Sequence, residues 1–182
     1  MIRSEDESFI KRCLDGDTQV FGLLVDKYQK PIYNIIYRMC HNLEDARDIT
    51  QGVFVRAYQK LNTFDIEKKF FSWLCRIAIN ETLNFLKQQK KMVEVPISMP
   101  GNEKGADHAV ANKEEREQIH RALMEIESKY RILIILKHFQ NFSYTQIGDM
   151  MNLPEKTIKS RLYTARQKLG QILVRHGMII YD

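Results

Sequence analysis

The chain has 182 residues, of which 44% are hydrophobic, and its formal net charge is +5 at pH 7. This length and hydrophobic content suffice for one folded domain or two small ones, and they exclude a disordered chain. No run of about 18 apolar residues occurs, and the first seven residues are acidic and polar, so we expect neither membrane insertion nor a secretory signal.

Helical periodicity dominates the first part of the chain, where few glycines or prolines interrupt it. A first helix is expected to begin near Glu5, and a second near Asp17, where Asp or Thr can cap it. Pro31 lacks a backbone donor, so we expect it to kink the second helix or to begin another. Asn42 is a good cap for a third helix, and a fourth is expected over residues 69–91. The apolar residues of the third helix recur at spacings of three and four, which predicts one buried face: Ala46, Ile49, Val53, Ala57 and Leu61.

The middle of the chain, "VEVPISMPGNEKGADHAVANKEE", holds two prolines and two glycines and shows no helical period, which predicts a flexible linker. Charge follows the same division. Residues 1–91 carry 15 basic and 12 acidic side chains, residues 92–115 carry 2 and 5, and residues 116–182 carry 11 and 6, so the net charges are +3, −3 and +5. The predicted fold is all-α, with two small helical domains at 1–91 and 116–182 joined by the linker at 92–115. Basic domains flanking an acidic linker suit nucleic-acid binding, although surplus surface charge would give the same count.

Four further helices are expected after the linker. One covers residues 114–127, and Ser128 can cap the next. That second helix is expected to bury Leu133, Leu136 and Phe139. The stretch "FSYTQIGDMMNLPEKTIKSRLYTARQKL" then predicts a helix-turn-helix, because Ser143 and Gln146 form a capping box and Pro154 suits the first position of the following helix.

The second helix of this motif separates into two faces when its residues are plotted at 100° each. Ile158, Leu162, Ala165 and Leu169 share one face and are expected to pack inward. The opposite face carries Lys156, Ser160, Tyr163, Thr164 and Gln167. Cations lie on both flanks: Lys159, Arg161, Arg166 and Lys168. Such a helix suits a major groove, with the outward face at base edges and the flanks at phosphates, although a solvated amphipathic helix has the same pattern. Gly148 in the preceding helix predicts a close crossing of the two helices, or else a local weakness.

The ionisable residues give no sign of a metal or catalytic site. Cys13, Cys40 and Cys75 lie far apart without a C-x-x-C pair, and the five histidines are scattered. We therefore expect reduced thiols in a cytoplasmic protein, with no metal, no cofactor and no small-molecule substrate.

The order of motifs resembles an extracytoplasmic-function (ECF) sigma factor of bacterial RNA polymerase. The likeness runs from "IKRCLDGDTQVFGLLVDKYQKPIY" through "EDARDITQGVFVRAYQKLNTF" and "FFSWLCRIAINETLNFLKQQKK" to the helix-turn-helix. It implies two helical domains, sigma regions 2 and 4. It also implies a transcription initiation factor that binds core RNA polymerase, reads promoter DNA, assists strand opening and is restrained by an anti-sigma factor, often membrane-bound.

The resemblance also assigns roles to particular residues. The expected contacts with the polymerase clamp helices are Asp45, Asp48, Gln51 and Arg56. The expected contacts with the minus-ten element are Phe64, Lys69, Trp73, Arg76, Asn80, Lys87, Lys90 and Lys91. The expected contacts with the minus-thirty-five element are Lys156, Thr157, Lys159, Ser160, Arg161, Tyr163, Thr164 and Arg166. Asn80 matches a position at which the family uses a loop between two helices to capture a flipped base.

Several of these residues have a second interpretation. Phe71, Leu74 and Ile77 share helical spacing and are expected in the core, and Trp73 fits the core equally well. Gly52 stands where the family often has an acidic residue, and Thr164 where many members have Arg.

The sequence also bears on two other classes of protein. A stand-alone helix-turn-helix regulator would need a helical ligand-sensing front domain, which the sequence allows. An enzyme with a DNA-binding tail is disfavoured, because no G-x-x-x-x-G-K-[ST], H-E-x-x-H or G-x-S-x-G pattern occurs.

Overall fold

The computed structural model describes residues 5–93 and 110–178. These residues form helices joined by turns, and no strand occurs among them, so the predicted all-α class is confirmed. The N-terminal domain consists of α1 (Glu5–Leu14), α2 (Phe21–Cys40), α3 (Leu43–Gln59) and α4 (Phe70–Val93). The C-terminal domain consists of α5 (Val110–Glu125), α6 (Ser128–Ile134), α7 (Tyr144–Met151) and α8 (Glu155–Arg175). Most of the predicted linker, residues 94–109, lies outside the described residues, and α5 begins inside the range predicted for that linker.

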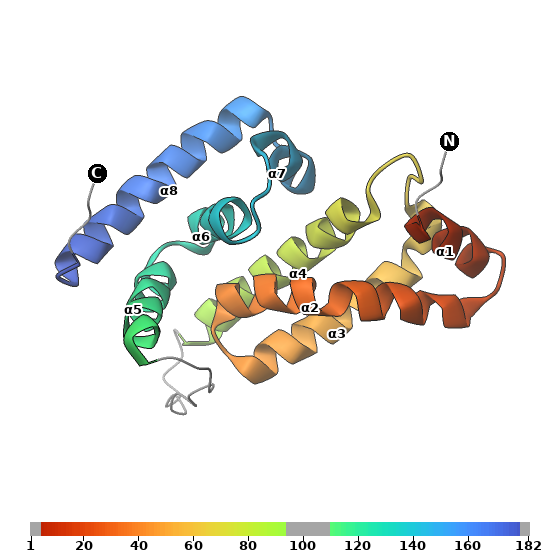
Figure 1. Cartoon of the computed structure of the whole chain (residues 1–182), viewed down its shortest axis with the longest axis horizontal. Helices are drawn as coiled ribbons and strands as arrows, with labels where there is room; N and C mark the ends of the chain where they lie inside the picture. Colours follow the sequence, from red (N-terminus) through yellow and green to blue (C-terminus); the bar gives the residue numbers. More distant parts are fainter. Residues whose placement is uncertain (1–4, 94–109, 179–182) are drawn as a thin grey trace.

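The N-terminal domain is built from three long helices, α2, α3 and α4, with α1 packed across one end (Figure 1). Its buried residues recur at helical spacing on each helix, as the apolar pattern predicts. Asn42 caps α3, because its side chain accepts from the backbone amides of Glu44 at 2.9 Å and Asp45 at 3.0 Å. His41, in the left-handed conformation with φ 55°, ends α2 and allows the sharp turn into α3.

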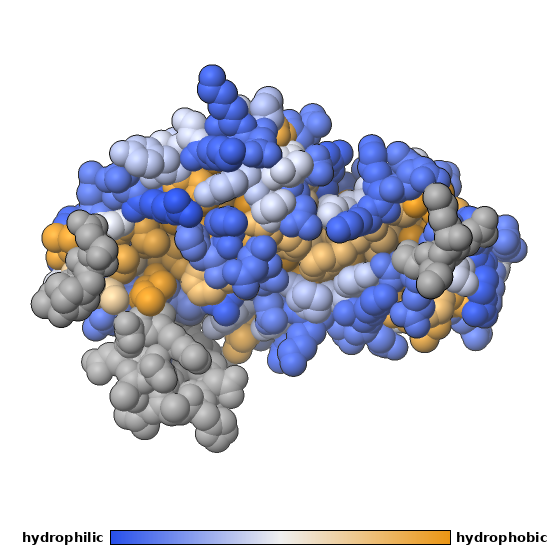
Figure 2. All heavy atoms as spheres, turned by 45° about the horizontal axis from the view of Figure 1, so that its top comes forward, coloured by the Kyte–Doolittle hydropathy of each residue, from blue (hydrophilic) through white to orange (hydrophobic). Residues whose placement is uncertain are grey.

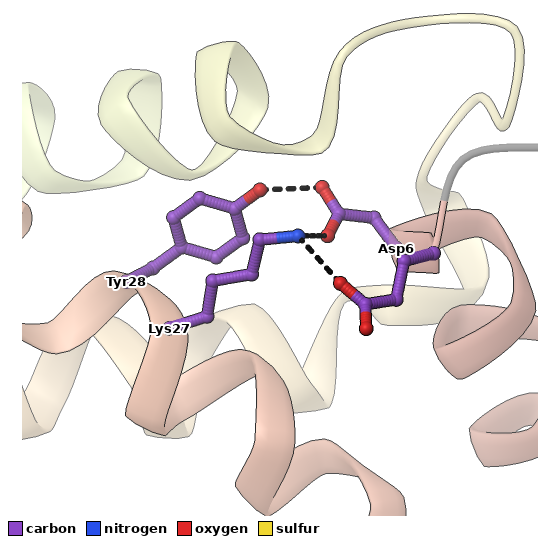
Figure 3. Close-up of polar contacts among 4 residues, drawn as sticks. Asp6, Lys27 and Tyr28 are labelled. Carbon is purple, nitrogen blue, oxygen red and sulfur yellow. Dashed lines mark hydrogen bonds and ion pairs between the residues drawn. The ribbon is translucent and has the colours of Figure 1, made fainter.

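Figure 3 shows how α1 is fixed to α2. Lys27 donates to the Asp6 carboxylate at 2.6 Å, and the Tyr28 hydroxyl donates to the same group at 2.5 Å (Figure 3). Burial, followed by the hydrogen bond to Asp6, raises the pKa of Tyr28 to about 12. The Tyr28 ring also stacks on Phe71 of α4 at 5.1 Å, so one side chain connects three helices.

The predicted cap of α2 was wrong. The Asp17 side chain makes no capping hydrogen bond, and α2 begins four residues later, after a short 3-10 turn at Thr18–Val20. Pro31 does not begin a new helix, because α2 continues through it to Cys40, and the alternative, a kink at Pro31, stays a prediction. Buried residues flank Pro31 on both sides, and their packing holds the helix together despite the missing hydrogen bond: Leu24, Ile32, Ile35 and Ile36.

The C-terminal domain contains the predicted helix-turn-helix, α7 and α8. Ser143 and Gln146 form the predicted capping box at the start of α7. Gly148 is required by the close crossing, because a Cβ there would lie 2.7 Å from the Leu153 carbonyl oxygen. Pro154 is the cap of α8 rather than its first residue, so that detail of the prediction was wrong.

Two expectations about α6 were also wrong. Ser128 is the first residue of the helix, and no side chain caps it. Phe139 is 36% exposed, because α6 widens into a π-helical turn at Ile135–Phe139 and this residue leaves the buried face. Its ring instead lies under the Arg38 guanidinium of α2, with 4.2 Å between the guanidinium carbon and the ring centroid.

The two domains pack against each other, and α6 and α7 lie beside α4 (Figure 1). One cluster of buried hydrophobic residues extends through both domains. On the face that Figure 2 shows, polar side chains cover most of the surface and hydrophobic ones appear as patches between them.

Candidate nucleic-acid interface

Helix α8 has the two faces predicted from its sequence. Ile158, Leu162 and Ala165 are at most 1% exposed and pack into the domain core, and Leu169 is half-buried. Tyr163, on the opposite side, is 65% exposed. Four further residues on the outward side or flanks are exposed: Lys156, Ser160, Arg161 and Gln167. The rotational assignment of α8 is therefore confirmed.

Several α8 side chains already have partners within the domain. Lys159 pairs with Glu155 at 2.6 Å, and its ammonium lies 5.5 Å from the Tyr144 ring centroid. Thr145 donates to the same Glu155 carboxylate at 2.7 Å, and these bonds from Lys159 and Thr145 hold the pKa of Glu155 below its usual range. Exposed ion pairs contribute at most about 1 kcal/mol, so an arriving phosphate can replace such a partner.

Arg166, a second cation on the flank of α8, is oriented by His138, which sequence reasoning missed. Arg166 donates its Nε–H to Nε2 of His138 at 3.2 Å, from α8 to the π-helical turn. Burial and two neighbouring cations, Arg166 and Lys137, lower the pKa of His138, so the imidazole is a neutral acceptor. The contact joins positions 28 residues apart, so no local pattern could have revealed it. Thr157 and Thr164 are half-buried, and Thr164 donates to the Ser160 carbonyl at 3.2 Å.

Helix α4 carries a second set of polar residues along one face. Spacings of three, four and seven residues place five residues within about 60° of one another around an α-helix of 3.6 residues per turn: Trp73, Arg76, Asn80, Lys87 and Lys91. We call these five residues the α4 stripe. All except the half-buried Trp73 are exposed, and Lys69 and Lys90 beside the stripe are exposed as well.

An aromatic cluster stands at the N-terminal end of the α4 stripe. The Trp73 ring lies 5.2 Å from Phe64 and 5.5 Å from Phe70, measured between centroids. Phe64, in extended backbone before α4, meets Phe70 edge to face at 5.5 Å. Trp73 therefore belongs partly to the core while part of its ring stays accessible. Leu74 and Ile77 are core residues as predicted, whereas Phe71 is only half-buried.

The expected loop at Asn80 is absent from the structure. Helix α4 runs unbroken from Phe70 to Val93, and Asn80 is an exposed residue within it. The segment contains no glycine or proline that would end a helix, which explains the continuity. The irregular chain that directly precedes α4 is the turn at residues 64–69.

Arg76 is engaged by the C-terminal domain. Its Nε donates to the Met150 carbonyl at 3.3 Å, and its Nη2 donates to the Asp149 carbonyl. These carbonyls end α7, and a guanidinium suits the negative end of a helix.

Helix α3 presents the residues expected to meet the polymerase. Asp48 and Gln51 are exposed, and Asp45 is half-buried with a pKa raised by burial and by the neighbouring carboxylates. Arg56 is exposed but pairs with Glu81 of α4 at 3.1 Å. Sequence reasoning missed two exposed apolar residues on the same helix, Val55 at 52% and Tyr58 at 43%, which the core spacing of α3 could have indicated.

The described residues hold no group of three or more His, Cys, Asp or Glu side chains that could bind a metal ion. Burial raises the pKa of all three thiols, that of Cys75 to about 12, so none is an activated nucleophile. Within the described parts of the chain, no helix is long and apolar enough to cross a bilayer.

The architecture defines a class, a two-domain helical protein whose second domain ends in a helix-turn-helix with a basic outward face. Residues 24–92 match the family model of sigma-70 region 2, and residues 116–169 match that of sigma-70 region 4. The chain is 34% identical to the ECF RNA polymerase sigma factor SigW of Bacillus subtilis, over 90% of this chain and 94% of the relative. It is 29% identical to the RNA polymerase sigma-H factor of Pseudomonas aeruginosa, over 95% of this chain and 96% of the relative.

Solved structures agree in fold. CnrH, in complex with the cytosolic domain of CnrY, superposes with a TM-score of 0.70 at 21% identity, covering 94% of this chain and 99% of that one. RpoE of Bartonella quintana, in complex with the anti-sigma factor NepR, superposes with a TM-score of 0.68 at 21% identity, covering 84% of this chain and 96% of that one. The chain belongs to the ECF family of RNA polymerase sigma factors. It is a transcription initiation factor that directs RNA polymerase to promoters, and the stand-alone regulator is not favoured.

Proposed function

We propose that the three surfaces described above divide the work of initiation. Helix α8 reads the minus-thirty-five element, the α4 stripe with its aromatic cluster holds the minus-ten element, and α3 contacts the polymerase clamp helices. The observation that carries the proposal is the separation of α8 into a buried seam and an outward face of polar, aromatic and cationic side chains.

The outward face of α8 suits base edges because it offers hydroxyl, amide and ammonium groups over several turns. Ser160 and Tyr163 point away from the seam, and hydrogen bonds from such positions discriminate between bases. Lys159 and Arg161, on opposite flanks, suit the phosphates on either side of a major groove. Lys159 would then exchange Glu155 for a phosphate oxygen.

The α4 stripe suits a melted strand. Unpaired bases stack on aromatic rings, and cations follow the backbone. Trp73 and Phe64 supply the rings at one end, and Lys87 and Lys91 supply the charge at the other, with the Asn80 amide between them. Asn80 acts from the surface of a continuous helix in this proposal.

The outward face of α3 suits a protein partner, because carboxylates and the Gln51 amide lie beside exposed Val55 and Tyr58. Asp48 is exposed near the start of the helix, so Asp48→Arg should leave the core intact. We expect the variant to bind core polymerase more weakly, by about tenfold, since one contacting charge is reversed. Titration with core enzyme measures the loss, and circular dichroism checks the helix content. Affinity equal to that of the parent would remove α3 from the docking surface.

We also propose that an anti-sigma partner restrains the protein. Of the two structures with the same fold, RpoE is in complex with the anti-sigma factor NepR, and CnrH is in complex with the cytosolic domain of CnrY. We place the protein in the cytoplasm, held at the inner face of the membrane when its partner is membrane-bound. Its relatives are named as sigma factors, so we assign it no catalytic activity, cofactor or small-molecule substrate of its own.

The experiment is transcription in vitro with core polymerase on fragments of the genome. We expect the chain to select a set of promoters that share sequences at both elements, and to bind core polymerase in a separate titration. Sequence-specific DNA binding without core binding would instead support the stand-alone regulator.

A further inference from the structure

The two domains meet in a contact that uses specific side chains as well as apolar packing. Arg131 of α6 is 8% exposed, and its guanidinium donates to the Met39 carbonyl at the end of α2. Arg76 of α4 donates to carbonyls at the end of α7, and Phe71 meets Phe142 at 5.9 Å between centroids. We call this surface the interdomain contact.

Two histidines face each other within the interdomain contact. His41 ends α2 and His120 lies on α5, and their rings stack with 4.4 Å between centroids and 27° between planes. The Nδ1 atoms of both rings are buried and have no hydrogen-bond partner. Tyr37 packs against both rings, at 5.5 Å from His41 and 6.0 Å from His120. Both Nδ1 atoms are therefore shielded from solvent and have no acceptor or donor from the described residues.

The charges around the histidine pair are mostly positive. Arg38 of α2 and Arg131 of α6 both oppose a charge on His120. Arg131 bonds the carbonyls that end α2 and α5, and the Arg38 guanidinium lies over the Phe139 ring. Among the residues whose side chains are described, the exposed Glu117 of α5 acts in the opposite direction and raises the pKa of His41. Tyr37 and the Cys40 thiol, also on α2, are neutral at physiological pH because burial raises both pKa values.

We propose that the histidine pair makes the interdomain contact acid-sensitive, so that protonation of His41 or His120 releases the C-terminal domain from the N-terminal one. A proton placed on either ring would create a cation stacked on its neighbour, beside Arg131 and Arg38, and the charged ring would carry an N–H at the buried Nδ1, where no described residue accepts it. Burying such a charge is costly, and separation of the domains gives the ring access to water.

The direction with pH follows from the pKa values. Burial lowers the pKa of both histidines in the closed form, and for His120, with His41, Arg38 and Arg131 adding to the effect, to about 4. In the open form both return to about 6.5. The closed form is therefore fully favoured above about pH 6.5 and loses stability as the pH falls from there toward the closed-form pKa. As the pH falls from about 7.5 to about 5.5, protonation of His120 alone should raise the ratio of open to closed molecules about tenfold. Protonation of His41 should raise the ratio further, by a factor of up to about ten.

Opening has a consequence for promoter recognition that rests on the proposed function. It frees Arg76, which belongs to the α4 stripe and is held by α7 in the closed form. The two promoter elements are separated by about 25 base pairs, or about 85 Å at 3.4 Å per pair, whereas α7 and α4 are in contact here. Acidification would thus favour the arrangement that binding to both elements requires.

The test uses the full-length chain, with a fluorophore pair attached through unnatural amino acids at exposed Gln59 of α3 and exposed Val174 of α8. Single-molecule energy transfer then counts open and closed molecules between about pH 7.5 and 5.5. We expect the ratio of open to closed to rise by at least about tenfold in the parent. In the His41→Phe/His120→Phe variant, which keeps stacked rings and cannot be protonated, we expect the ratio to stay constant. The matched control is His176→Gln. His176 does not belong to the histidine pair, and its Nε2 lies 2.7 Å from the carboxylate of Glu125. The response of this variant to pH should equal that of the parent.

A constant ratio in the parent would overturn the proposal, as would an equal rise in the double variant. Histidine ring resonances of the unlabelled parent give a measurement that does not depend on any variant. His120 should titrate well below 6.5, and a midpoint at 6.5 in the folded chain would also overturn the proposal. Neither outcome bears on whether α8 binds DNA, so failure here is distinct from failure of the proposed function.

Discussion

The two proposed DNA surfaces differ in how accessible they are. In the described part of the chain, the cations of α8 pair with residues of their own domain, and their ion-pair partners are exposed, such as Glu155 for Lys159 and Glu127 for Lys168 at 3.2 Å. The α4 stripe is partly occupied, because Arg76 is bonded to the end of α7. One surface is therefore ready for duplex DNA, while the other becomes complete only after the domains separate.

This difference fits the two tasks. Reading a duplex needs a preformed helix face, and the buried seam of α8 provides that rigidity. Holding an unpaired strand needs aromatic rings and cations that would also attract nucleic acid at random. In the free protein the end of α7 covers Arg76, which limits nonspecific binding of nucleic acid to the α4 stripe.

The largest effect is expected from Leu162→Ala. Leu162 is 1% exposed in the α8 seam, and removing such a side chain costs about 2–5 kcal/mol of the free energy of unfolding. Urea denaturation measures the loss. The control is Ser160→Ala on the outward face of α8, which should change the free energy of unfolding by less than about 0.5 kcal/mol. Equal costs for the two variants would mean that the faces of α8 are assigned incorrectly.

Tyr163→Ala should weaken specific DNA binding without unfolding the domain. The ring is 65% exposed, so its loss opens no cavity. If it contacts a base, holoenzyme binding to the minus-thirty-five element should fall by about 1–3 kcal/mol, and the preference at particular base pairs should relax. Selection from a randomised element compares the variant with Gln171→Ala, an exposed residue two turns farther along α8. An unchanged preference in the Tyr163 variant would leave α8 a solvated helix at that position.

Asn80→Ala should act on opening rather than on duplex binding. Asn80 is exposed within α4, so the helix should persist, and alanine favours it. Loss of one amide contact to an unpaired base should cost about 1 kcal/mol, or about fivefold in the open fraction. Permanganate reactivity of thymines at the minus-ten element measures this in the holoenzyme. Reactivity equal to that of the parent would assign Asn80 a structural role only.

The smallest effect is expected from Lys159→Ala. If Lys159 meets a phosphate, all sequences should bind slightly more weakly, and the slope of log affinity against log salt should decrease by about one. The loss is small because binding must first break the ion pair with Glu155. Binding at several salt concentrations measures the slope. A changed base preference would instead place Lys159 inside the groove.

Local patterns predicted most of the fold, because helical spacing, caps and the capping box depend on residues within one or two turns. Asn42, Ser143 and the seam of α8 are such cases. The continuous helix at Asn80 could also be predicted, since no glycine or proline interrupts it, but the resemblance to the family implied a loop there. That expectation was wrong.

Contacts between distant residues could not be predicted. Arg76 and Arg131 are each ordinary basic residues of an amphipathic helix in sequence, yet they bond carbonyls 73 and 92 residues away. The His41–His120 stack likewise joins two helices across the linker. Nothing in local spacing encodes such partners, because they depend on how the two domains pack. The sequence therefore predicted the outward face of α8, and it could not predict which of the candidate DNA-contacting residues the other domain covers.

The most direct test of the division of work is one selection experiment with holoenzyme on promoters randomised at both elements. It compares the parent, a Ser160→Ala/Tyr163→Ala variant of α8 and an Asn80→Ala variant of α4, and scores base preference at each element together with permanganate reactivity. The account predicts that the α8 variant loses preference only at the minus-thirty-five element, and that the α4 variant loses opening only at the minus-ten element. Changed preference at the minus-ten element in the α8 variant, with the minus-thirty-five preference intact, would contradict it.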